Sequence, residues 1–262
     1  MADVPDFPAF FAPGTPAFLA DPYATYRALR QRAPVLYRPE HDDWVVTGYA
    51  EVSALLKDDR IGFRVTATDM GAPGIGGPEG LHREARRILE LWFSHQAPPD
   101  HTRLRSLVAG AFSPERTNRL RERGEDVASA CLDRAIADSR LAHVLASEAI
   151  GIPERWRPVL WALTADMRLS VMAAHHPVNL ARGSMATAGL VQRFREIIAE
   201  ARSASGEDSL LRDLIRARDH GLLSEDELLA QLTLLLYGGE ANSQNLVGNA
   251  VLALLRHPDQ LD

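Results

Sequence analysis

Apolar residues recur along most of the chain at spacings of three and four, the pattern typical of amphipathic α-helices. Tyr23, Tyr26 and Leu29, for example, share one face of a predicted helix over residues 21–34. The pattern changes near residues 35–47, where two short β-rich runs, VLYRP and DDWVVTGY, flank the polar EHD and indicate a hairpin. Further helices are predicted over residues 49–58, 81–93, 101–112, 114–139, 153–175, 184–204 and 207–220. The expected fold is therefore mainly α, with one small N-terminal β hairpin.

The longest predicted helix covers residues 224–257. Ser224 and Glu227 have the spacing of a capping box, which marks its first turn. No proline interrupts the segment before His257-Pro258. At about 1.5 Å per residue this helix spans roughly 50 Å, so we expect it to be the central helix of the fold.

The middle of this helix has an unusual composition. Gly238 and Gly239 are adjacent, although glycine inside a helix costs about 1 kcal/mol relative to alanine. Asn242 and Ser243 follow within one turn and can offer hydrogen bonds. Two explanations are open: another helix packs closely against the glycines, or a flat, bulky ligand lies against this face.

Composition limits the class of protein. The 262 residues are 46% apolar and 24% charged, with a formal net charge of −6, whereas a nucleic-acid-binding protein is usually basic. No run of about 18 apolar residues suggests a membrane span. The N-terminal residues do not resemble a signal peptide. Cys131 is the one cysteine, so the chain has no internal disulfide, and we expect a cytoplasmic protein.

A second feature is the segment PPDHTRLR. His101 and Arg105 are four residues apart, so they lie on one face of the predicted helix 101–112. Both side chains can donate to anionic oxygens, and arginine can do so with two nitrogens. We expect no metal site, because the adjacent His175 and His176 cannot share a helix face.

Five segments follow one another along the chain: DPYATYRALR, WVVTGY, EVSALLKDDR, APPDHTRLRSLVAGAFSPER and LLSEDELLAQLTLLLYGGEANSQNLVGNAVLALLRHPDQL. In this order they resemble the N-terminal two-thirds of a bacterial, soluble cytochrome P450. The resemblance runs through almost the whole chain and is most specific at residues 98–116 and 222–261. It implies that residues 1–262 form a single, incomplete domain of that helical fold, in which residues 224–257 are the long central I helix.

The resemblance also implies roles for individual residues. His101 and Arg105 match the pair that binds the haem propionates. Gly238 and Gly239 match the small residues of the I helix that leave room for oxygen and substrate beside the haem. Residues 66–93 and 168–190 match the regions that line or cover the substrate pocket.

The I helix departs from the family pattern at its polar pair. The family usually has an acid followed by threonine, and the aligned residues here are Ala241 and Asn242. Glu240 lies one residue earlier, about 100° away around the helix. Asn242, Ser243 and Glu240 are therefore the candidate catalytic residues of an altered oxygen-activation motif.

Two further departures concern the haem ligand and the length. The ExxR motif and the cysteine-containing haem loop of the family follow the I helix, so we expect residues 1–262 to lack them. Cys131 lies in a predicted helix, VASACLDRAI, and is expected to be a structural cysteine. Residues 139–148 are about ten residues shorter than the corresponding family region.

Two functions follow from the resemblance. In the first, the chain belongs to a haem-thiolate monooxygenase lineage that oxidises a small, secondary-metabolite substrate with electrons from a ferredoxin-type donor, and it is inactive alone. In the second, it is a haem-free relative that activates a partner enzyme such as a glycosyltransferase. A gene fragment without activity is the third alternative.

Overall fold

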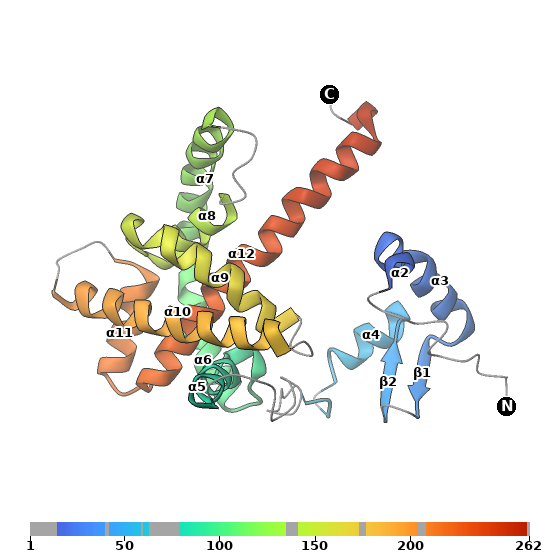
Figure 1. The fold of residues 1–262 in the computed structure, drawn as a ribbon, viewed down its shortest axis with the longest axis horizontal. Helices are drawn as coiled ribbons and strands as arrows, with labels where there is room; N and C mark the ends of the chain where they lie inside the picture. Colours follow the sequence, from blue (N-terminus) through green and yellow to red (C-terminus); the bar gives the residue numbers. More distant parts are fainter. Residues whose placement is uncertain are drawn as a thin grey trace. The chain divides into compact units, whose positions relative to one another are not determined.

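The computed structural model describes residues 15–39, 42–58, 60–62, 79–134, 141–172, 177–203 and 208–260. The chain divides into two compact units, Met1–Gly62 and Phe63–Asp262 (Figure 1). Each unit is described by itself.

The first unit combines three short helices with the predicted hairpin. Its elements are α2 (Pro16–Ala20), α3 (Pro22–Arg32), β1 (Val35–Arg38), β2 (Asp43–Val46) and α4 (Tyr49–Leu55). Asp21 caps α3, because its side chain accepts hydrogen bonds from the backbone N–H groups of Tyr23 and Ala24. The two strands are antiparallel, with Val35 opposite Val46. The hairpin predicted near residues 35–47 is confirmed.

The second unit is helical in its described residues. Its elements are α5 (Glu79–Glu90), η1 (Phe93–His95), α6 (Asp100–Ala109), η2 (Gly110–Phe112), α7 (Pro114–Arg134), α8 (Leu141–Ile150), η3 (Glu154–Trp156), α9 (Arg157–Met172), α10 (Pro177–Ser203), α11 (Leu210–Asp219), α12 (Glu225–Arg256) and η4 (Pro258–Gln260). The mainly α fold class is confirmed.

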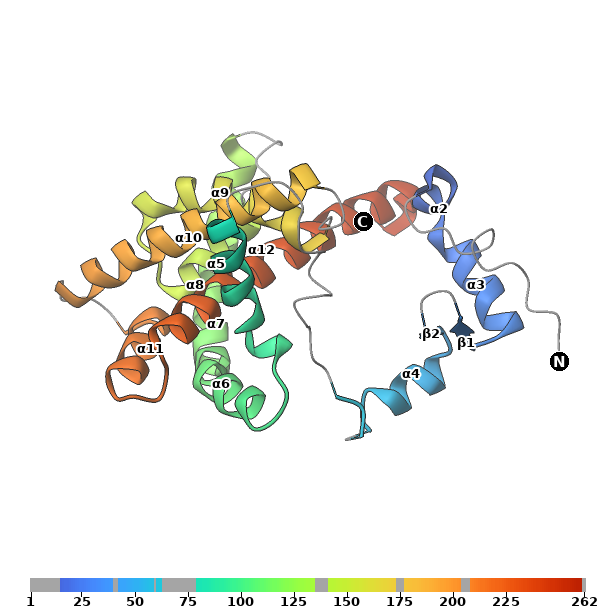
Figure 2. The same ribbon diagram turned by 60° about the horizontal axis from the view of Figure 1, so that its bottom comes forward.

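Helix α12 is the long helix that the sequence predicted. Its capping box is formed: Ser224 Oγ accepts from the Glu227 N–H at 3.2 Å, and the Glu227 carboxylate accepts from the Ser224 N–H at 2.7 Å. The first half of α12 is buried among the other helices, and residues 245–256 are exposed throughout. Figures 1 and 2 show this second half extending beyond the remaining helices of the unit.

The core of the unit lies where α9 and α10 pack on each other and on α12. Leu160 and Met167 of α9 and Leu190 and Phe194 of α10 are fully buried there. The first half of α12 adds a further set of buried side chains, Leu228, Leu229, Leu232 and Leu236. This packing holds the middle of α12 in a defined position.

Several predicted boundaries were wrong. Helix α10 begins at Pro177, earlier than the predicted residue 184, because proline is well suited to the first helical position. Helix α9 begins at Arg157 after a 3₁₀ turn rather than at residue 153. Helix α8, whose ten residues pack between α7 and α12, was not predicted from the sequence. The loop residues 66–78 and His175-His176 lie outside the described residues.

Candidate functional site

An apolar cavity of about 310 Å³ lies beside the middle of α12. Its size is at the lower end of the range of small-molecule pockets, about 300–1,000 Å³. Side chains from η1, η2, α7, α8, α11 and α12 line it: Phe93, Phe112, Leu120, Ala146, Ala149, Ile150, Leu210, Leu234, Leu235, Gly238 and Gly239. The double glycine of α12 therefore lies in the wall of a cavity.

The two glycines have different surroundings. A Cβ atom on Gly239 would stand 2.9 Å from Cβ of Ala146 on α8, so this glycine allows the two helices to approach closely. A Cβ atom on Gly238 would meet no heavy atom within 4 Å. Close helix packing thus explains Gly239, and open space explains Gly238.

His101 lies beside the wall of this cavity. Its ring centroid is 6.1 Å from that of Phe93, which lines the cavity, and its side chain is half-buried. Arg105 follows one turn later on α6 and is exposed. Within the part of the chain that the structure describes, Arg105 makes no ion pair or hydrogen bond. Its guanidinium is therefore available to an anionic group, although whether it points toward the glycines stays a prediction.

The neighbouring Arg103 has a structural role instead. It forms ion pairs with Asp100, at 2.9 Å, and with Glu227 of the α12 capping box. It also donates to the backbone oxygen of Leu222 at 3.0 Å. Burial acts to raise the pKa of the Glu227 carboxyl, but hydrogen bonds from Arg103 and Ser224 hold this pKa below its usual value. Arg103 therefore fixes α6 to the start of α12.

The three candidate catalytic residues lie on different sides of α12. Glu240 is 1% exposed, and its carboxylate lies 3.0 Å from Nδ1 of His143 on α8. Asn242 and Ser243 are exposed. The Asn242 side chain donates to the backbone oxygen of Gly238 at 3.4 Å, which places its amide one turn from the cavity glycine. The structure thus leaves Asn242 exposed, bonded to its own helix, and turns Glu240 into the interior.

His143 is a site neighbour that the sequence analysis missed. It is 1% exposed and lies in the apolar segment LAHVLASEAI. A histidine inside the apolar run LAHVLA was the available signal, because a buried polar group needs a partner. Its partner, Glu240, is distant in sequence and could not be paired with it from spacing alone.

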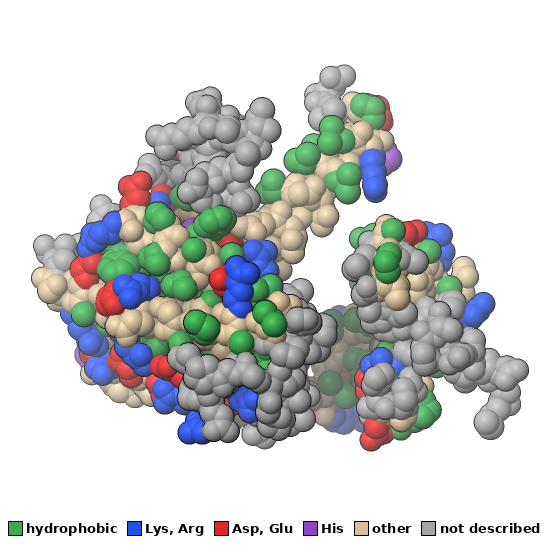
Figure 3. Space-filling model, viewed as in Figure 1, with side chains coloured by type: hydrophobic (Ala, Val, Ile, Leu, Met, Phe, Trp, Pro, Cys, Tyr) green, Lys and Arg blue, Asp and Glu red, His purple; other side chains and the backbone are tan. Residues whose placement is uncertain are grey.

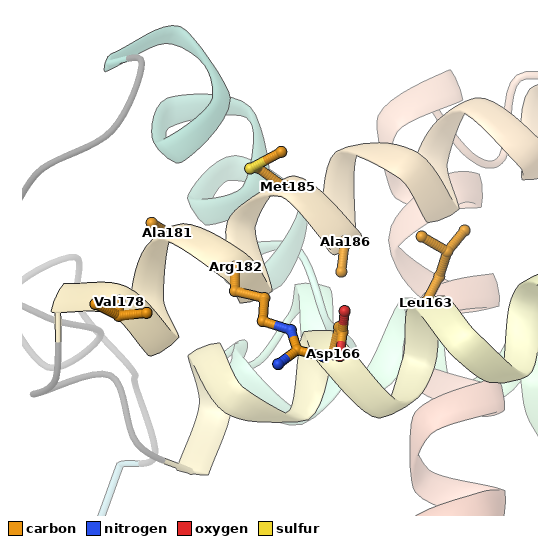
Figure 4. Close-up of a pocket in the computed structure, with 7 residues that line it drawn as sticks. All are labelled: Leu163, Asp166, Val178, Ala181, Arg182, Met185 and Ala186. Atoms are coloured by element: carbon orange, nitrogen blue, oxygen red, sulfur yellow. Dashed lines mark ion pairs between the residues drawn. The ribbon is translucent and has the colours of Figure 1, made fainter.

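A second pocket, of about 710 Å³, lies between α9 and α10 (Figure 4). Most of its lining residues belong to the region 168–190 that the resemblance associates with the substrate pocket. The carboxylate of Asp166 and the guanidinium of Arg182 point toward each other across it and form an ion pair at 2.7 Å. The remaining lining is apolar: Leu163, Val178, Ala181, Met185 and Ala186.

No group of three or more His, Cys, Asp or Glu side chains in the described ranges is arranged to hold a metal ion. Cys131 lies on α7, eleven residues after the cavity residue Leu120. At 1.5 Å per residue this separation is about 16 Å along the helix axis. None of the described helices is long and apolar enough to cross a membrane.

The fold and the site together are those of a mainly α protein with an apolar cavity against a long central helix. The chain is 33% identical to the cytochrome P450 monooxygenase PikC of Streptomyces venezuelae over 93% of its own length and 58% of that protein. It is 31% identical to the 6-deoxyerythronolide B hydroxylase of Saccharopolyspora erythraea over 100% of its length and 65% of that protein. The crystal structure of CalO2 superposes with a TM-score of 0.79 at 28% identity, covering 96% of this chain and 64% of that one.

The chain belongs to the cytochrome P450 family. No protein-family model matches it. It spans about 60% of the length of the curated relatives that it matches.

Proposed function

We propose that residues 1–262 are part of a P450-type haem-thiolate monooxygenase that oxidises a small organic substrate, of the kind found in secondary metabolism. The observation that supports this proposal most directly is the open face of Gly238 on an apolar cavity. Two of the relatives are named as a monooxygenase and a hydroxylase. Haem, when bound, supplies the redox chemistry that inserts one oxygen atom into such a substrate.

The residues of the cavity fit the edge and one face of a haem group. His101 and Arg105 would hold the propionates, because the first lies beside the cavity wall and the second has no partner among the described residues. Gly238 would leave room next to the flat face, where any larger side chain would fill the space. Asn242, whose amide is one turn away, and Ser243 would hydrogen-bond a ligand or water there.

The thiolate ligand of a haem-thiolate enzyme would have to come from a cysteine. Cys131 is about 16 Å along α7 from the cavity wall, so it does not fit this role. We infer that residues 1–262 supply the propionate contacts and the open face, lack the axial thiolate, and do not insert oxygen alone. We also infer that residues 1–262 belong to one domain and that the protein is cytoplasmic. A complete form would take electrons from a ferredoxin-type donor.

A second candidate is a haem-free P450-like partner that activates a glycosyltransferase or another pathway enzyme. It is favoured by Ala241 and Asn242, which replace the acid and threonine that the family usually places on the I helix. It is opposed by Arg105, which has no partner among the described residues, since a haem-free protein has no need for a propionate ligand.

Titration of the purified chain with hemin tests the first function. We expect quenching of tryptophan fluorescence and a shift of the hemin absorption band. Arg105→Ala should weaken this binding about ten- to hundredfold, because the propionate loses a charge-assisted hydrogen bond worth about 1.5–3 kcal/mol. Arg119→Ala is the matched control, since Arg119 is an exposed arginine of α7 that pairs with Glu115.

Equal hemin affinity in Arg105→Ala and the parent would contradict the haem assignment of this residue. Absence of hemin binding together with stimulation of a glycosyltransferase would favour the second function.

A further inference from the structure

Glu240 and His143 form a buried pair that the proposed function does not use. Each side chain is 1% exposed. His143 Nδ1 lies 3.0 Å from Glu240 Oε2, and His143 Nε2 lies 2.9 Å from the backbone oxygen of Arg157 at the start of α9. The hydroxyl of Ser147 is 3.4 Å from the same Nε2 atom. The pair therefore joins α12, α8 and α9 at one place.

The direction of each hydrogen bond follows from the two ends of this chain of groups. At one end, the Arg157 carbonyl can only accept, so His143 Nε2 carries a hydrogen. At the other end, the Arg168 guanidinium can only donate, so Gln244 Oε1 accepts from it at 3.5 Å. Gln244 Nε2 then donates to Glu240 Oε1 at 3.3 Å.

One contact remains, between His143 Nδ1 and Glu240 Oε2. Because Glu240 Oε1 already accepts from Gln244, a carboxylate that accepts at both oxygens fits the site. With Nδ1 of His143 on Glu240 Oε2 and Gln244 on Glu240 Oε1, both carboxylate oxygens have a partner. These partners are what allow two ionisable side chains to be buried together.

The pair lies next to the close contact between α12 and α8. Gly239, the residue before Glu240, meets Ala146, which is one turn after His143. Two successive residues of α12 thus hold the same stretch of α8, one by close packing and one by a charged hydrogen bond. With both in place, α12 cannot rotate, and Gly238 and Asn242 remain on their present sides.

We infer that Glu240 and His143 are a positioning pair, which fixes the rotation of the α12 turn 238–242 at the cavity. Glu240 is accordingly not a proton donor to the cavity, because it is buried against α8. The inference rests on the proposed function only where it treats the cavity as the ligand site. The test of the positioning pair needs no haem, so a failure of this inference can be distinguished from a failure of the proposed function.

Hydrogen exchange of the backbone amides in the ligand-free chain tests the inference. Glu240→Ala removes the carboxylate that His143 Nδ1 contacts and that accepts from Gln244 Nε2, and we expect at least tenfold faster exchange in residues 238–244 and 141–150. Glu240→Gln should restore exchange to within about twofold of the parent. The amide can donate to the neutral His143 ring and accept from Gln244, so every group keeps a partner.

Two comparisons make the result specific to the cavity turn. Residues 190–198 of α10 serve as the internal control and should exchange as in the parent. Glu200→Ala is the matched variant, because Glu200 also joins two elements, accepting from Trp156 Nε1 at 3.1 Å. It should leave residues 238–244 unchanged.

If Glu240→Ala does not fold, Gln244→Ala provides the milder test. It removes the donor to Glu240 Oε1, and we expect at least threefold faster exchange in residues 238–244. Unchanged exchange there in either variant would overturn the inference. Equal acceleration in α10 would also overturn it, since the pair would then stabilise the whole unit without positioning the turn.

Discussion

Gly239 of α12 lies directly against Ala146 of α8, so close that a Cβ atom on the glycine would stand 2.9 Å from Cβ of the alanine. A Cβ atom on its neighbour Gly238, which points to another side of the helix, would meet no heavy atom within 4 Å. The adjacent glycines should therefore respond differently to the same substitution.

We expect Gly238→Ala to raise the free energy of unfolding by up to about 1 kcal/mol, because alanine has the higher helix propensity. Gly239→Ala should be less stable than Gly238→Ala by about 1–3 kcal/mol, since the new methyl group forces α8 and α12 apart. Urea unfolding of the two variants measures this difference. Equal stability would show that α8 moves without cost.

Gln231 attaches α12 to the segment that carries the cavity residue Phe93. Its side chain is fully buried, accepts from the Phe93 N–H at 3.1 Å and donates to the Leu91 carbonyl at 2.8 Å. Gln231→Leu leaves both backbone groups without this partner, and we expect a loss of about 2–5 kcal/mol from two unsatisfied buried groups. Thermal unfolding measures the loss. A variant as stable as the parent would show that water replaces the amide.

The capping box of α12 should make the stability of the chain depend on pH in the acidic range. Hydrogen bonds from Arg103 and Ser224 hold the pKa of Glu227 below its usual value despite its burial. A carboxyl with a lowered folded-state pKa contributes stability above its unfolded pKa, about 4.3, and loses it as the pH falls through the folded value. We expect Glu227→Gln to be less stable than the parent by about 1 kcal/mol at pH 6, and this difference should shrink as the pH falls through the folded-state pKa of Glu227.

Thermal unfolding between pH 6 and pH 3 tests this dependence. Glu115→Gln serves as the control, because Glu115 is an exposed acid in the first turn of α7. A constant difference between Glu227→Gln and the parent at all pH values would contradict the assignment.

The second half of α12 exposes a set of large apolar side chains (Figure 3): Leu246, Val247, Val251, Leu252, Leu254 and Leu255. Apolar patches of this kind bind other molecules or promote association. We expect the purified 262-residue chain to bind a hydrophobic dye and to associate in a concentration-dependent way. Leu246→Gln combined with Leu255→Gln should reduce dye fluorescence without lowering the melting temperature, since both leucines are 69% exposed.

Dye fluorescence and analytical ultracentrifugation measure these effects. A monomeric parent chain that melts cooperatively and binds no dye would contradict the prediction. It would also favour the partner-protein function over an incomplete enzyme.

The sequence alone determined the helical class, the hairpin and the long helix, because each depends on local chemistry. The spacing of apolar residues, the Ser224–Glu227 capping box and the β-rich runs around EHD act within a few residues of one another. The sequence also singled out Gly238 and Gly239, since two adjacent glycines conflict with helix propensity whatever surrounds them.

Only the tertiary structure decided which glycine packs and which faces the cavity, and that Glu240 turns to His143. These facts depend on the approach of α8 to α12, and α8 was not predicted as a helix. His143 and Glu240 are 97 residues apart, and no local pattern encodes such a pair. The burial of a charged group depends on which helices meet, because its cost is offset only by a partner that the packing brings within hydrogen-bonding distance.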